Sequence, residues 1–233
     1  MNKKRWFGGN GAVWLAVLLV GLGLTLPALA EVQSVFCRAG KFWVVTDGAT
    51  SEILSEVKLP HEIIVNTNGM FIVAKGKERQ LEDGQRIGRD GMLLSTNGLI
   101  EPVYNHIAVK GGKVVVVRDG VVAALTAPMP LPNGTVIKPD STMTRPGGMQ
   151  VRLVDGQLFN LDGTTIATRD TISLHSGKVV LQRDGSLMTL LPIQVTEMSD
   201  GTRVTGTGLV TYRDGRKVQL TEGQIIIVAG VAR

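Results

Sequence analysis

The feature that most constrains this 233-residue chain is a pair of sequence frames, each present three times. The first frame is Gly-Lys, a short apolar run, a polar or basic residue and Asp-Gly, at residues 40–48, 112–120 and 177–185. The second frame is Leu-x-Asp/Glu-Gly-Gln, at residues 81–85, 153–157 and 220–224. Self-similarity of this kind predicts three tandem copies of one supersecondary unit.

The spacing between the copies is nearly constant. Copies one and two align without a gap at an offset of 72 residues from Gly40 to Gly91. Copy three follows copy two at an offset of 65 through Leu125 and Leu190, and then at 67 from Asn133 and Asp200 onward. A two-residue insertion between those points in copy three accounts for the change.

Turn signals indicate what the copies contain. After residue 30, twelve Asp-Gly or Asn-Gly pairs separate short runs rich in Val, Ile, Leu and Thr. Such pairs suit the positive φ angles of two-residue hairpin turns, and the runs between them suit strands. The frames therefore predict turn glycines at Gly48, Gly120, Gly185, Gly84, Gly156 and Gly223. No part after residue 30 has the apolar spacing and caps of a helix.

The predicted fold class is all-β, with three small antiparallel β-meander or barrel-like repeats in a row. We place the repeats at 31–103, 104–169 and 170–233, after a signal peptide at 1–30. A continuous β-solenoid is the alternative, although copies of this length are large for one solenoid rung. The continuous apolar runs around Val44, Val116 and Leu181 predict strands buried on both faces. The alternating prolines at 128–132 predict a polyproline-like connector or an edge segment.

The first 30 residues predict export. A basic head at Lys3, Lys4 and Arg5 precedes an apolar stretch, and the small residues Ala28 and Ala30 fit a signal peptidase site, so we expect a mature chain starting at Glu31. An uncleaved anchor is the alternative. After cleavage we expect no transmembrane span, and a location in the periplasm or outside the cell.

Removal of the leader leaves 22 basic and 20 acidic residues, so the basic character of the whole chain gives no reason to expect nucleic-acid binding. The single cysteine, Cys37, allows no intramolecular disulfide, which leaves buried apolar surface as the main source of stability.

Few residues suggest chemistry. His61, His106 and His175 occupy non-equivalent repeat positions with no second histidine or cysteine nearby in sequence, so we predict no metal site and no cofactor. Turn aspartates from adjacent copies could still converge on calcium. The matching glutamines Gln85, Gln157 and Gln224 are candidates for a row of ligand-binding side chains, because repeats can present one residue in a line.

One resemblance can be named. Copy two combines the Gly112-Lys113 strand, Asn133-Gly134-Thr135 and the terminal Asp155-Gly156, and it resembles an uncharacterised domain family of secreted bacterial proteins. Copy three has Asp200 and Glu222 in place of Asn133 and Asp155, and copy one has His61-Glu62-Ile63 at the Asn-Gly-Thr position. The resemblance implies export and repetition, and it implies no activity.

These observations favour a non-catalytic, exported repeat protein that binds an envelope or extracellular macromolecule or has a structural role there. The alternative is a small-molecule or metal carrier with a pocket between units. A secreted hydrolase is third, and it rests on the export signal alone.

Overall fold

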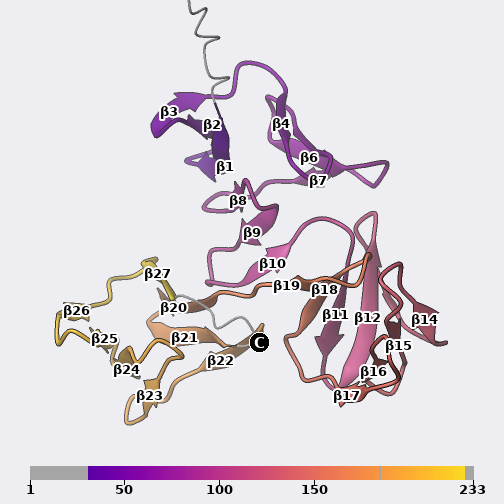
Figure 1. Cartoon of the computed structure of the whole chain (residues 1–233). Coiled ribbons are helices and arrows are strands. Elements are labelled where there is room, and N and C mark those ends of the chain that lie inside the picture. The colour runs from indigo at the N-terminus through magenta and orange to yellow at the C-terminus, as the bar shows by residue number, and fades with distance from the viewer. Residues whose placement is uncertain (1–30, 184, 229–233) are drawn as a thin grey trace, which may run out of the picture.

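The computed structural model describes residues 31–183 and 185–228, so the predicted signal peptide lies outside the described residues. The described chain has no helix, and therefore no helix that could cross a membrane. It forms six small antiparallel sheets, and none of them closes into a barrel (Figure 1). The all-β prediction is confirmed. The separate sheets fit repeated β modules and do not form a continuous solenoid.

The first repeat has two sheets. A hairpin sheet is completed by a late strand, β8, which pairs with β1, and a four-stranded meander, β4 to β7, lies between them in sequence. The strands are β1 (Val32–Arg38), β2 (Lys41–Thr46), β3 (Ala49–Glu52), β4 (Val57–Leu59), β5 (Ile63–Val65), β6 (Met70–Val73), β7 (Arg79–Gln80), β8 (Arg86–Gly88), β9 (Met92–Leu94) and β10 (Ile100–Pro102). The last two extend the first sheet towards the second repeat.

The second repeat has the same strand order. Its strands are β11 (His106–Lys110), β12 (Lys113–Arg118), β13 (Val121–Ala124), β14 (Met129–Pro130), β15 (Val136–Ile137), β16 (Thr142–Thr144), β17 (Gln150–Arg152), β18 (Leu158–Asn160) and β19 (Thr165–Ile166). Strand β18 pairs with β11 as β8 pairs with β1. The proline-rich stretch supplies β14, which is an edge strand of the meander. Of the two predicted alternatives, the edge segment is therefore confirmed.

The third repeat repeats this order again. Its strands are β20 (Asp170–His175), β21 (Lys178–Arg183), β22 (Ser186–Thr189), β23 (Val195–Glu197), β24 (Arg203–Thr205), β25 (Leu209–Thr211), β26 (Lys217–Gln219) and β27 (Ile225–Val228). Strand β27 pairs with β20.

The turns follow from the frames. Asp119 and Gly120, between β12 and β13, have φ angles of 52° and 78°, which is the pair of positive angles that a type I′ turn needs. Asp47 and Gly48 do the same between β2 and β3. The six predicted turn glycines all have φ between 73° and 85°.

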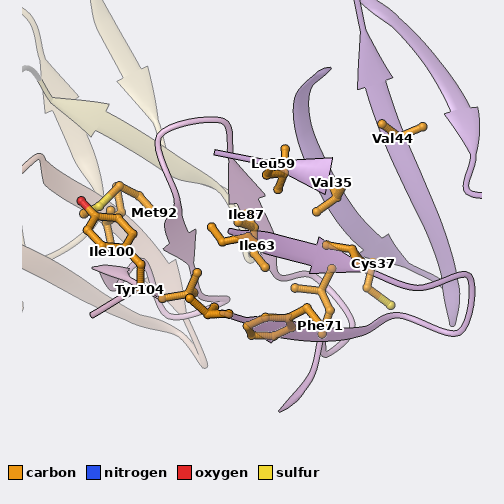
Figure 2. Packing of buried hydrophobic residues seen from close by; sticks show 14 of the residues in the cluster. Val35, Cys37, Val44, Leu59, Ile63, Phe71, Ile87, Met92, Ile100 and Tyr104 are labelled. Atoms are coloured by element: carbon orange, nitrogen blue, oxygen red, sulfur yellow. The ribbon is translucent and has the colours of Figure 1, made fainter. Parts of the chain in front are cut away.

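Each repeat has its own apolar cluster, and the first cluster extends into the second repeat. In the first repeat, Val35 and Ile87 of one sheet pack with Ile63 and Phe71 of the other (Figure 2). Ala108, Leu158 and Ile166 of the second repeat join the same cluster. The β11 sheet thus packs one face on the first repeat and the other on its own meander, where Ile107 and Val109 are buried.

This arrangement corrects one burial prediction. Val44 and Leu181 are buried, but Val116 and the residues that flank Val44 are only half-buried. The predicted burial on both faces is therefore wrong for β2 and β12. The strands covered most fully on both faces are β11 and β20, which precede the Gly-Lys frame. The reason is that both faces of these strands are packed. Strand β11 lies between its own meander and the first repeat. Strand β20 packs on its own meander and binds residues 97 and 98 on the other side.

The third repeat also makes contacts with the segment between the first two repeats. Side chains of the third repeat bind the segment that leaves the first one, near β10 in Figure 1. Thr171 Oγ1 donates to the carbonyl oxygen of Gly98 at 2.6 Å, and Ser173 Oγ donates to that of Asn97 at 2.9 Å. Gln182 bonds both the N–H and the C=O of Ile100. The third repeat thus contacts the segment that leaves the first repeat.

Candidate functional site

The acidic residue of the second frame closes the hairpin turn that begins the first frame. Asp155 Oδ1 accepts a hydrogen bond from the backbone N–H of Gly112 at 2.7 Å, and Asp83 Oδ1 accepts one from Gly40 at 3.2 Å. Glu222 accepts from Gly177 and Ser176, and these two backbone bonds lower the pKa of its carboxyl group. The two frames recur together because they are in contact in each repeat.

The three glutamines have an equivalent local contact. The side-chain carbonyl oxygens of Gln85, Gln157 and Gln224 each accept the backbone N–H three residues earlier, at 3.0 to 3.1 Å. This contact closes a turn within each repeat and accounts for the repetition of glutamine without a ligand. The ligand row stays a hypothesis.

The fold brings two of the three histidines to one tyrosine. The ring of His61 stacks on that of Tyr104 with centroids 4.0 Å apart, and the ring of His106 lies edge-on to Tyr104 at 6.4 Å. Residues 45 positions apart in sequence thus meet where the first and second repeats join, and no spacing in the sequence signals it. Among the described residues, no group of three or more His, Cys, Asp or Glu could hold a metal ion.

A cavity of about 330 Å³ lies where all three repeats meet. We call it the junction cavity, and its lining consists of residues 99–101, 109–111 and 185–187 with His106, Gly156 and Leu158. His106 is 4% exposed, and burial lowers its pKa. Its Nδ1 lies 2.7 Å from the carbonyl oxygen of Tyr104, which fixes the proton on Nδ1 because a carbonyl can only accept.

The third repeat also carries an exposed apolar segment, residues 188–195. Met188, Leu191, Ile193 and Val195 are all exposed, and Ile193 reaches 90%. Residues Leu191 to Gln194 form a turn in which the N–H of Gln194 donates to the carbonyl of Leu191 at 2.9 Å. Gln194 Oε1 accepts the N–H of Leu191 at 2.8 Å, so the turn is closed as in the second frame. This geometry holds Ile193 outward at the tip.

Comparisons with known proteins give one result. A family model described as a domain of unknown function, DUF6799, matches residues 104–165 and 169–231, which together make up more than half of the chain. No curated protein and no solved structure shows significant similarity to this chain. Residues 31–103 lie outside the matched ranges, although their strand order is the same. The tandem matches show that the chain belongs to the family of the domain of unknown function DUF6799.

Proposed function

We propose that the protein is an exported, non-catalytic binding module whose third repeat presents the apolar segment to a protein partner in the envelope or outside the cell. The observation that carries this proposal is the exposed turn with Ile193 at its tip. A solvent-exposed side chain of this size gains free energy only when a partner removes it from water. The closed turn reduces the conformational entropy that binding would otherwise cost.

The first repeat acts as an internal comparison, because it has the same strand order and its equivalent connection exposes one large apolar side chain, that of Leu54. At the position of Met188 the first repeat has Ser51, and at that of Val195 it has Glu56. Between the buried residue Ile53 and Glu56 it has two residues, where the third repeat has the four residues of the turn. The fold therefore does not require an apolar insertion at this place.

The chemistry of the segment favours a protein over a lipid surface. Residues 186–196 contain no charged and no aromatic side chain, and the next residue is Glu197. Segments that bind at a membrane interface usually combine apolar residues with Lys or Arg and with Trp or Tyr. An apolar pocket of a protein places no such demand on the residues that flank the side chain it binds.

In vivo photo-crosslinking tests the proposal. A photoreactive residue in place of Ile193 should capture a protein from cells that express the chain. The matched control is the same residue in place of Leu54, which is 86% exposed and occupies the equivalent connection in the first repeat. Equal capture from both positions, or lipid adducts alone, would overturn the protein partner.

A further inference from the structure

The junction cavity is separate from the apolar segment, and its chemistry points to a second kind of ligand. We propose that the cavity binds a small, uncharged, mainly apolar molecule that carries one hydroxyl group. The inference does not depend on the protein partner proposed above, because it uses the opposite side of β22: Leu187 lines the cavity, while Met188 points to the other face of the sheet.

The volume sets the size of the ligand. A dry cavity of about 150 Å³ holds one benzene ring, so a cavity of about 330 Å³ has room for roughly ten carbon atoms. Two fused rings or a short branched chain would fit. This is the lower end of the size range of small-molecule sites in proteins.

The walls are mainly apolar and come from three parts of the chain. Ile100, Val109 and Leu158 are buried, and Leu187 is half exposed at the side of the third repeat. Gly185 approaches Gly156 so closely that a Cβ atom on it would lie 2.7 Å from the Gly156 Cα. The absence of side chains at these two glycines lets the second and third repeats close one wall of the cavity.

His106 supplies a hydrogen-bond acceptor in this lining. Because Nδ1 donates to the Tyr104 carbonyl, Nε2 of the neutral ring is an acceptor. Within residues 31–183 and 185–228, Nε2 makes no hydrogen bond to protein. The other repeats differ here: Thr171 occupies the equivalent position in the third repeat, and its hydroxyl donates to Gly98. An acceptor that has no protein donor in a mainly apolar lining favours a ligand with an O–H group.

The charges in the lining favour an uncharged ligand. Lys110 Nζ lies 3.4 Å from Glu101 Oε2, and both side chains are about half exposed. They neutralise each other, so neither offers a free counter-ion to a charged ligand, and an unpaired ion among apolar walls would be costly.

Calorimetry on the purified chain with 1-naphthol and 1-methylnaphthalene tests the proposal, because the two probes share one ring system and a methyl group of similar size replaces the hydroxyl in the second. We expect 1-naphthol to bind more tightly, and His106→Phe to lower this preference by about threefold to tenfold, the worth of one hydrogen bond. A melting curve of this variant checks that it is folded. No binding of either probe, or a preference unchanged by His106→Phe, would overturn the proposal.

A matched pair of tryptophan variants locates the site and does not depend on the His106 variant. Leu187→Trp adds bulk at the cavity wall, and it should weaken 1-naphthol binding at least tenfold, because the added rings take up the free volume. Leu54→Trp changes an exposed leucine of the first repeat that lies outside the cavity, and it should leave binding unchanged. Equal effects of the two variants would place the bound probe elsewhere and refute the assignment.

Discussion

At the residue scale, single side chains of the second frame hold the turns of the first. Asp155 binds the turn that opens β12 across 43 residues of sequence. The positive φ of the turn glycines could be predicted from the Asp-Gly and Glu-Gly pairs, because glycine tolerates that region. The contact between the two frames could not, because spacing along the chain does not show which turn a carboxylate reaches.

Gly120 and Gly185 allow backbone strain to be separated from crowding. Both have positive φ, but a Cβ on Gly120 would meet nothing closer than 3.7 Å, whereas one on Gly185 would clash with the Gly156 backbone. We expect Gly120→Ala to cost about 1 kcal/mol and Gly185→Ala clearly more, measured by urea titration. Val121→Ala at an exposed strand position is the control, and two equal losses would contradict the close approach.

The buried His106 gives a pH dependence whose sign is fixed. Its pKa is lowered in the folded state by burial, so the unfolded chain takes up the proton first as the pH falls. The stability that the neutral His106 contributes is therefore fully present above the pKa of the unfolded chain, near 6.5. It is lost as the pH falls below that value. Melting curves at pH 7.5 and 5.5 should show that the melting temperature drops less between these pH values for His106→Gln than for the unchanged chain. Equal losses would mean that His106 does not titrate as a buried group.

At the scale of elements, the sequence identified the strands that follow each Gly-Lys pair and the turns between them. It missed β11 and β20 as the most buried strands, because His106, Thr171 and Ser173 interrupt their apolar pattern. Those polar side chains are buried because they bind carbonyl groups, and a hydrophobic pattern cannot report a hydrogen-bond partner.

The difference between central and edge strands gives a test within one sheet. Ile107 of β11 is fully buried and Val121 of the edge strand β13 is exposed. We expect Ile107→Ala to cost about 2–5 kcal/mol, as buried large-to-small changes do. Val121→Ala should stay within about 0.5 kcal/mol. Denaturant titration measures both, and comparable losses would show that β11 is not the covered strand.

At the scale of the molecule, the predicted cleavage site meets a feature of the first repeat. The backbone nitrogen of Glu31 lies 3.2 Å from Asp47 Oδ1, so cleavage after Ala30 would place the new ammonium group beside a carboxylate. We expect the intact mass of the exported protein to correspond to a chain that starts at Glu31. A mass that retains residues 1–30 would show an uncleaved leader and would support the anchor instead.

The arrangement of the three repeats rests on polar contacts that no repeat frame contains. Gln182, which is buried, makes two of these contacts. Its equivalents in the other repeats are Val117 and Val45, whose side chains cannot bind backbone groups. The sequence therefore predicted the units but not how the third one packs against the segment between the first two. These contacts place Ile100 and Leu187 in the wall of one cavity.

Replacing Gln182 with Leu should separate the third repeat from the rest of the molecule without destroying the repeats. The variant leaves the N–H and C=O of Ile100 without their partners, and an unmatched buried polar group costs about 1–3 kcal/mol. We expect faster amide hydrogen exchange at Ile100, together with weaker 1-naphthol binding, while exchange in β5 and β6 of the first repeat stays slow. Gln219→Leu is the control, because that exposed glutamine bonds only Thr207 within its own repeat. If Ile100 exchanges equally slowly in both variants, Gln182 does not hold the third repeat in place, and the apolar contacts around the connecting segment must do so.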